Sequence, residues 1–204
     1  MWCSTRWPAE LLPGLALALA LGASAWASPG APAPAPAPTS PPPIRAAAAG
    51  SHAQLPGSRL QGEATLRFFG LRVYHARLWT LPDFRPEQAS EQPLVLELEY
   101  LRDLNGRAIA ERSLKEMQRA GGFTEAQGQT WLAQMQRLFP DVKAGDRIRG
   151  LNEPGQGARF WHNGKPIGRV DDDAFARLFF GIWLAPSSSE PEMRQALLGA
   201  SGTR

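Results

Sequence analysis

A proline-rich stretch divides the chain and decides which part of it is able to fold. Residues 28–50 read SPGAPAPAPAPTSPPPIRAAAAG, and eight of the 19 prolines lie between Pro29 and Pro43. This stretch lacks the large apolar side chains whose burial offsets the entropy lost when a chain becomes ordered. We therefore expect a disordered Pro/Ala-rich linker over residues 28–54, with the folded domain after it.

The linker has two interpretations. In the polyproline II conformation, at about 3.1 Å per residue, residues 28–43 would span roughly 50 Å. The linker is either a leader without a role of its own or a spacer that holds the domain away from a membrane. The spacer requires that the segment preceding it stays attached.

The segment before the linker, residues 1–27, has the pattern of a secretory signal peptide. Arg6 precedes an apolar run over residues 11–22, and Ala25-Trp26-Ala27 matches a small-residue cleavage site. Such a run rises only about 18 Å as a helix, which is short of a hydrocarbon core of roughly 30 Å. We expect cleavage after Ala27, a periplasmic or secreted protein, and no transmembrane helix thereafter. An uncleaved N-terminal anchor is the alternative.

Charge and cysteine content exclude several classes of protein. Lys and Arg number 22 against 19 Asp and Glu, and the formal charge of +3 is not gathered in a block. This pattern argues against a nucleic-acid partner. The single cysteine, Cys3, would leave with the signal peptide, so no internal disulfide is expected. No Cys and His residues have zinc-binding spacing, and we expect neither a metal nor a cofactor.

The rest of the chain, residues 55–200, is long enough to bury a hydrophobic core. Alternating apolar residues predict strands over residues 59–79, 94–101, 146–151, 158–162 and 165–170. Gly70 is expected to bend the first of these or to mark a bulge. The strand over residues 94–101 should have one buried face and one mostly wet face. Asn163-Gly164 is a strong signal for a hairpin.

Apolar residues at helical spacing predict two helices in the middle of the domain. The first begins after Asn105-Gly106 and ends at Gly121-Gly122. The second is expected to begin with a capping box made by Thr124 and Gln127, and Pro140 stops it.

Two further helices are predicted near the C-terminus. One begins at residues 171–173 and is closed by Pro186, and the other is capped by Ser189 with Glu192 and ends at Gly199. The order of the elements predicts an α+β fold, in which an antiparallel β-sheet carries a layer of α-helices on one face.

Few residues suggest catalysis. Asp171, Asp172 and Asp173 could bind a hard cation, but negative charge where a helix begins is explained by capping and by the helix dipole. His75 and His162 lie on separate strands without a neighbouring ligand, so neither is expected to bind metal or act as a base. No nucleophile elbow or phosphate-binding loop follows a strand.

Tyr100 and Arg102 share one face at the end of the strand over residues 94–101. If both point toward the helices, Arg102 is able to hold a carboxylate while Tyr100 and aromatic residues such as Trp131 take an apolar tail. In the alternative, Arg102 only pairs with an acidic residue of the next helix, such as Glu111.

Several segments resemble the chalcone isomerase-like proteins of bacteria, over residues 61–199. In chain order they are FFGLRVYHARLW, YLRDLNG, LFPDV with AGD, HNGKPIG, FARLFFGIWLAP and MRQALLG. The resemblance implies an open-faced sandwich, with a large antiparallel sheet, helices on one face and a ligand cleft between them. Related members without isomerase activity bind fatty acids.

The catalytic residues of chalcone isomerase are not matched. Aligned on Val73-Tyr74 and on Gly106, the positions of the catalytic side chains are occupied by Leu66, Phe69, Ile109, Arg112 and Glu116. Only Arg112 keeps a charge that the enzyme has there. Hydrogen-bond donors that stabilise developing charge usually provide the largest catalytic effect, and they are missing. The resemblance therefore implies a member without catalytic residues.

These features favour an exported, non-catalytic domain that binds a small apolar or amphipathic ligand such as a fatty acid. The candidate ligand-binding residues are Tyr74, Tyr100, Arg102, Arg112 and Trp131. One alternative is an intramolecular lyase acting on a chalcone-like substrate through Tyr100, Arg102 and Arg112. The other is a protein-interaction module of the cell envelope, whose protein partner is open.

Overall fold

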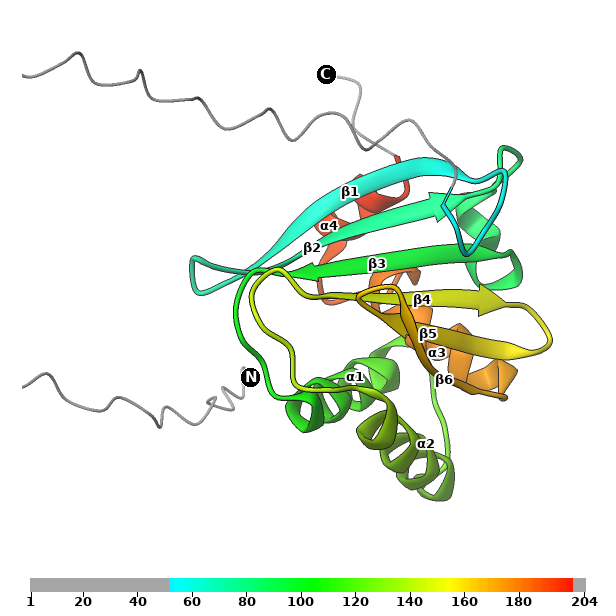
Figure 1. The fold of residues 1–204 in the computed structure, drawn as a ribbon. Helices are drawn as coiled ribbons and strands as arrows, with labels where there is room; N and C mark the ends of the chain where they lie inside the picture. The colour runs from blue at the N-terminus through cyan, green and yellow to red at the C-terminus, as the bar shows by residue number, and fades with distance from the viewer. Residues whose placement is uncertain (1–51, 200–204) are drawn as a thin grey trace, which may run out of the picture. The chain divides into compact units, whose positions relative to one another are not determined.

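A computed structural model describes residues 52–199, and the expected signal peptide and most of the expected linker lie outside them. The sheet has the order β1-β2-β3-β4-β5-β6, and each strand is antiparallel to the next (Figure 1). The predicted α+β class is confirmed. In chain order, the elements are β1 (Arg59–Phe68), β2 (Leu71–Thr80), η1 (Pro86–Glu91), β3 (Leu94–Tyr100), α1 (Gly106–Ala120), α2 (Glu125–Leu138), β4 (Arg147–Glu153), β5 (Gly157–His162), β6 (Lys165–Val170), α3 (Asp173–Leu184) and α4 (Pro191–Leu197).

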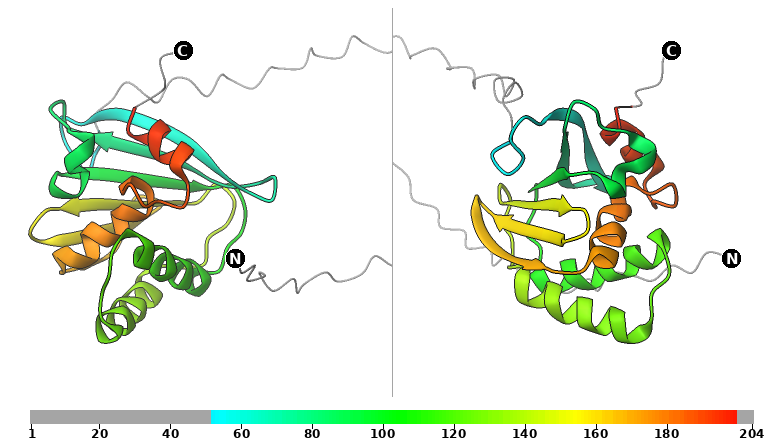
Figure 2. Two further views of the ribbon diagram at one scale, coloured as in Figure 1. Left: turned by 180° about the vertical axis from the view of Figure 1, so that it is seen from behind. Right: turned by 90° about the vertical axis from the view of Figure 1, so that its right-hand side faces the viewer.

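The two faces of the sheet are covered differently. Helix α3 packs on β4 and β5 and helix α4 on β1, which defines the inner face (Figure 2). Helix α1 packs against both α2 and α3. Residues 52–58 cross the opposite, outer face (Figures 1 and 2). None of the helices between residues 52 and 199 is long and apolar enough to cross a bilayer.

Aromatic side chains fill the core between α3 and the sheet. Phe175 and Phe179 are stacked on α3 with ring centroids 5.4 Å apart, and Phe160 of β5 meets Phe179 edge to face at 5.2 Å. A Cβ atom at Gly150 would lie 3.2 Å from the Phe160 and Phe180 rings, so this glycine allows the aromatic side chains to approach β4. Burial of these rings is the main stabilising contribution of the inner face.

The strand predicted over residues 59–79 is in fact a hairpin, and this corrects the expected bend. Strands β1 and β2 are joined by a two-residue turn at Phe69 and Gly70, with φ of 47° and 78°. Two positive φ values are typical of the tight turn that joins antiparallel strands. The alternating pattern continues through the turn, which is why periodicity alone did not reveal it.

The mostly wet face predicted for β3 is also corrected. Glu97 points to the outer face but is only 5% exposed. Arg77 of β2 and Arg149 of β4 contact its carboxylate, at 3.1 Å and 2.5 Å. His52 lies over the same carboxylate at 4.0 Å, and its ring centroid is 5.4 Å from that of Trp79. Residues 52–54, which composition placed in the linker, therefore already contact the sheet.

The middle helices begin and end where the sequence predicts. Asn105 caps α1 by accepting a hydrogen bond from the backbone N–H of Ala108 at 3.2 Å. Thr124 and Gln127 form the predicted capping box at the start of α2, with both reciprocal hydrogen bonds present. Short polar side chains at these positions satisfy N–H groups that have no partner within the helix.

The start of the last helix differs from the prediction. Helix α4 begins at Pro191, and Glu190 at its N-cap position makes no capping hydrogen bond with its side chain. The expected capping box of Ser189 and Glu192 is therefore wrong. Proline is preorganised for the first turn of a helix and lacks the N–H group that a cap would satisfy. The 3-10 helix η1 was not predicted at all.

Candidate functional site

Two tyrosines face each other on the inner side of the sheet. Tyr74 of β2 is the register partner of Tyr100 of β3, and their ring centroids are 6.1 Å apart at an interplanar angle of 74°. Tyr100 is 2% exposed, and it is the last residue of its strand. The pair therefore lies at the end of the sheet from which the chain continues toward α1.

The two hydroxyl groups differ in their partners. The indole N–H of Trp183 on α3 donates a hydrogen bond of 2.9 Å to the Tyr74 hydroxyl. Within residues 52–199, no side chain or backbone group is hydrogen-bonded to the Tyr100 hydroxyl. The hydroxyl is not among the side-chain atoms that are fully buried without a partner, so solvent or a ligand is able to reach it. A ligand oxygen is one partner that would satisfy it.

Both phenols stay protonated over the physiological pH range. Burial raises the pKa of Tyr74, against the opposing effect of the hydrogen bond from Trp183, and burial together with the neighbouring Tyr74 raises the pKa of Tyr100. A neutral phenol retains its O–H group as a hydrogen-bond donor. Tyr100 is therefore equipped to donate to an anionic or carbonyl oxygen.

Three charged side chains act electrostatically on the Tyr74 hydroxyl. The carboxylates of Glu190 and Glu116 raise the pKa of Tyr74, and the guanidinium of Arg112 lowers it. Arg112 pairs with Glu116 across one turn of α1 at 2.7 Å, and Glu116 is only 5% exposed. We refer to Tyr74, Tyr100, Arg112, Glu116, Trp183 and Glu190 as the tyrosine site.

Glu116 has two arginine partners, because Arg119 also pairs with it at 3.5 Å. Burial and the nearby charge of Glu116 raise the pKa of Glu190, with Arg112 acting in the opposite direction. Arg112 is about half exposed and uses one terminal nitrogen for Glu116 at 2.7 Å, which leaves other N–H groups of its planar guanidinium to bind a second carboxylate. The site thus offers one phenolic and one guanidinium donor.

The predicted ligand-binding residues do not all meet. Tyr74 and Tyr100 are paired across β2 and β3, and the guanidinium charge of Arg112 acts on the Tyr74 hydroxyl. Arg102 follows the end of β3, is exposed, and forms no ion pair with any residue between 52 and 199, Glu111 included. Trp131 of α2 is 1% exposed and donates to Asp172 at 2.9 Å, so its indole N–H is already satisfied by the protein.

The residues considered for metal binding have other partners. Asp172 caps α3 by accepting from the N–H of Phe175 at 3.0 Å, Asp173 accepts from the N–H of Gly155 at 2.7 Å, and Asp171 pairs with Arg169. Across the described part of the chain, no three His, Cys, Asp or Glu side chains are grouped so that they would hold a metal ion.

The two strand histidines also have partners. His75 bonds to Thr65 at 2.9 Å and to Glu63 at 3.1 Å, and His162 lies 3.5 Å from Asp146. His75 therefore contacts a carboxylate of β1, and His162 lies near a carboxylate just before β4.

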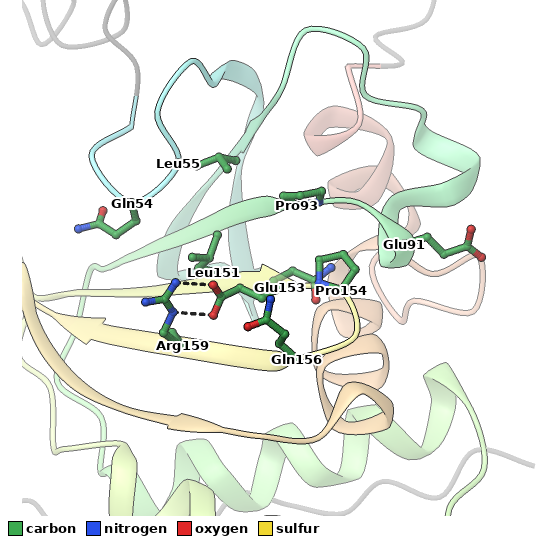
Figure 3. A pocket seen from close by; sticks show the side chains of 10 residues that line it. Gln54, Leu55, Glu91, Pro93, Leu151, Glu153, Pro154, Gln156 and Arg159 are labelled. Atoms are coloured by element: carbon green, nitrogen blue, oxygen red, sulfur yellow. Dashed lines mark hydrogen bonds and ion pairs between the residues drawn. The ribbon is translucent and has the colours of Figure 1, made fainter.

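A hollow lies on the outer face, away from the tyrosine site (Figure 3). Its volume is about 400 Å³, and a salt bridge between Glu153 and Arg159 forms part of its wall, with Arg159 Nε 2.5 Å from the carboxylate. Because these two charges neutralise each other, neither of them is left to bind a charged ligand in the hollow. Its lining residues are Gln54, Leu55, Glu91, Pro93, Leu151, Asn152, Glu153, Pro154, Gln156 and Arg159.

Sequence reasoning missed Trp183 and Glu190. Trp183 lies on the apolar stripe of α3, where an aromatic side chain is expected to be part of the core. The spacing of the residues does not distinguish a core tryptophan from one whose indole N–H makes a functional hydrogen bond. Glu190 precedes Pro191 in the short connection to α4. The cap predicted for this helix consists of Ser189 and Glu192, and the sequence pattern does not single out Glu190.

An antiparallel sheet with helices on one face and a polar cluster at one end of the helix–sheet interface defines an open-faced α+β sandwich. A sequence model of the chalcone isomerase-like family matches residues 52–199, which is most of the chain. The chain therefore belongs to the chalcone isomerase-like family, as its sequence motifs indicated.

Two known proteins are similar to the chain, one in sequence and one in fold. It is 32% identical over 112 residues to an uncharacterized protein of Haemophilus influenzae, a match that covers 55% of this chain and about half, 54%, of that protein. Its fold is similar to that of a fatty-acid binding protein of Arabidopsis thaliana, with a TM-score of 0.56 and 14% identity. That match covers 71% of this chain and 88% of the plant protein. At this identity the likeness shows the fold.

Proposed function

We propose that the chain binds a small amphipathic ligand with a carboxylate head, such as a fatty acid, at the tyrosine site, without isomerase activity. The observation that carries the proposal is the hydroxyl at the end of the buried Tyr100 side chain, which has no hydrogen-bond partner among residues 52–199 and is open to a ligand. A carboxylate accepting from Tyr100 and Arg112 would give both donors a partner.

The name of the plant structural neighbour supports this choice of ligand. That protein is a fatty-acid binding protein, and it shares the arrangement of sheet and helices. Fold alone does not establish function, so the argument for this chain depends on the tyrosine site.

The residues at the aligned catalytic positions of the isomerase support a non-catalytic role. Phe69 is 90% exposed at the tip of the β1–β2 hairpin, and Leu66 and Ile109 have no polar atoms in their side chains. None of these three side chains donates a hydrogen bond to a developing negative charge. We expect no turnover of chalcone-like substrates.

Binding of dodecanoate to the full chain, measured by isothermal titration calorimetry, tests the proposal. Tyr100→Phe and Arg112→Gln should each weaken binding about ten-fold, since each removes a hydrogen bond to a charged group. Arg107→Gln is the matched control, because Arg107 is an exposed arginine on the same helix that has no ion pair within residues 52–199. Equal binding by Tyr100→Phe and the wild type would overturn the proposal, and turnover of a chalcone would replace it with the lyase alternative.

We also propose that the protein is exported. The proposal is supported by the apolar run over residues 11–22 and the small residues that end at Ala27. Mass spectrometry of the protein from fractionated cells should find a free amine at Ser28 in the periplasm or the medium. An intact N-terminus in a membrane fraction would instead support the uncleaved anchor.

A further inference from the structure

The exposed large apolar side chains of residues 52–199 all lie in one place. They are Phe68, Phe69 and Leu71, which are 39%, 90% and 57% exposed. The hairpin that joins β1 and β2, and carries all three, extends beyond the other strands (Figures 1 and 2). Apolar side chains that are gathered rather than scattered on a surface mark an interaction site.

The geometry of the turn does not explain the phenylalanine at its tip. The turn of the β5–β6 hairpin, Asn163-Gly164, has φ of 49° and 81°, nearly the same as the 47° and 78° of Phe69-Gly70. Asn-Gly is the preferred pair for two positive φ values, whereas a bulky side chain is strained there. Phe69 therefore occupies a position where the backbone conformation favours asparagine, and its ring is exposed to solvent.

Two arginines lie directly below the tip. Arg67 of β1 and Arg72 of β2 are register partners, and both are exposed. Neither forms an ion pair with a residue between 52 and 199. Like charges directly opposite each other destabilise a sheet unless an anion lies between them. The arrangement is electrostatically unfavourable in the isolated domain and favourable next to a negative surface.

We propose that residues 67–72, the hairpin tip, dock on an anionic phospholipid surface. Phe69 and Leu71 insert at the level of the headgroups, and Arg67 and Arg72 contact lipid phosphates. A protein partner fits less well, because a stable protein interface covers about 800 Å² on each side and a single projecting turn presents much less.

The hairpin tip and the tyrosine site lie near each other along β2. Tyr74 follows Leu71 by three residues, which is about 10 Å in a strand. Docking of the tip would thus bring the tyrosine site close to the lipid surface. The membrane proposal goes beyond ligand binding and does not depend on it, since it stands on the exposed side chains alone.

The test uses the full chain with a reporter placed in the hairpin, because an uncleaved apolar N-terminal segment would be able to bind lipid independently of the hairpin. An environment-sensitive fluorophore is attached at Leu71→Cys in a Cys3→Ser background, and vesicles contain phosphatidylcholine with or without phosphatidylglycerol. We expect a fluorescence increase with phosphatidylglycerol and quenching by nitroxide-labelled lipids. Phe69→Asn should weaken the response about ten-fold, and Arg67→Gln/Arg72→Gln by about five-fold for each arginine.

Controls separate local insertion from other causes. The same fluorophore at Lys165→Cys, beside the Asn163-Gly164 turn, should not respond. Arg107→Gln/Arg137→Gln removes the same charge elsewhere and should change the response at position 71 less than two-fold. Because asparagine suits the turn, Phe69→Asn should fold, which its circular dichroism spectrum checks.

Three results would overturn the proposal. The first is no change in the fluorescence of the label at position 71 when vesicles are added, and the second is an equal fluorescence change from the label at position 165. The third is a fluorescence increase with protein concentration in the absence of vesicles, which would indicate that a second copy of the chain is the partner. Dodecanoate binding by Phe69→Asn in vesicle-free solution should equal that of the wild type. A failure of the membrane proposal is thereby distinguished from a failure of the tyrosine site.

Discussion

Glu97 shows how a single residue depends on its neighbours. Burial of this side chain raises its pKa, but contacts with His52 and Arg149, and the charge of Arg147 beyond them, outweigh that effect and hold the pKa at about 2. Arg77 adds an ion pair at 3.1 Å. A buried carboxylate of this kind is stable only while its partners are present and it stays ionised.

The low pKa of Glu97 predicts a loss of stability in acid. Because the pKa is lowered on folding, the stabilisation is complete above the unfolded value of 4.5 and is lost as the pH falls from there to about 2. The shift corresponds to about 3 kcal/mol in the free energy of unfolding. Urea unfolding of the wild type and Glu97→Gln between neutral pH and pH 2 measures it.

The two curves should converge toward low pH. Glu87→Gln removes an exposed carboxylate of η1 and controls for the loss of one negative charge. If the difference between the wild type and Glu97→Gln were the same at every pH, the ionised Glu97 carboxylate would not be the stabilising species.

The two tight turns allow a reciprocal exchange of residues. Phe69→Asn should raise the free energy of unfolding by about 1 kcal/mol, since it relieves a bulky residue at positive φ. Asn163→Phe should lower it by about 2 kcal/mol or more, because Asn163 also accepts from the N–H of Arg147 and donates to Asp146, both at 2.8 Å. Thermal and urea unfolding of both variants measure the effects, and a destabilised Phe69→Asn variant would contradict the assignment of strain.

At the scale of the element, the aspartates before α3 have different roles. Asp172 both caps the helix and accepts from the Trp131 indole, whereas Asp171 is an exposed partner of Arg169. Asp172→Ala should cost about 3 kcal/mol, and Asp171→Ala, which removes the same charge, about 0.5 kcal/mol or less. Urea unfolding distinguishes them. If millimolar Ca²⁺ raised the melting temperature of the wild type but not of Asp172→Ala, the aspartates would be a cation site after all.

Elements with local signals were predictable, and those fixed by distant contacts were not. The capping box of Thr124 and the turn at Asn163-Gly164 depend on side chains a few residues apart. The turn at Phe69 lacks the usual turn residue before its glycine. The outer face of β3 is covered by arginines of β2 and β4 and by His52, contacts that become visible only once the strands are paired.

For the whole molecule, sequence predicted the layers of the fold but only part of the candidate site. Strand parity placed Tyr100 on the inner face, and family resemblance indicated helices above it. Parity failed for Arg102, because β3 ends at Tyr100 and the alternation of faces ends with it. Trp183 and Glu190 join the site through the packing of α3 and the position of the α3–α4 connection, neither of which has a local signal.

The central claim is that a carboxylate ligand binds between Tyr100 and Arg112. A crystal structure of the full-length or naturally processed protein with dodecanoate tests it most directly. We predict that a carboxylate oxygen lies about 2.7 Å from the Tyr100 hydroxyl, within reach of the Arg112 guanidinium. The account would be contradicted if dodecanoate bound only at another site, or if the Tyr100 hydroxyl had no hydrogen bond to a ligand at saturating dodecanoate.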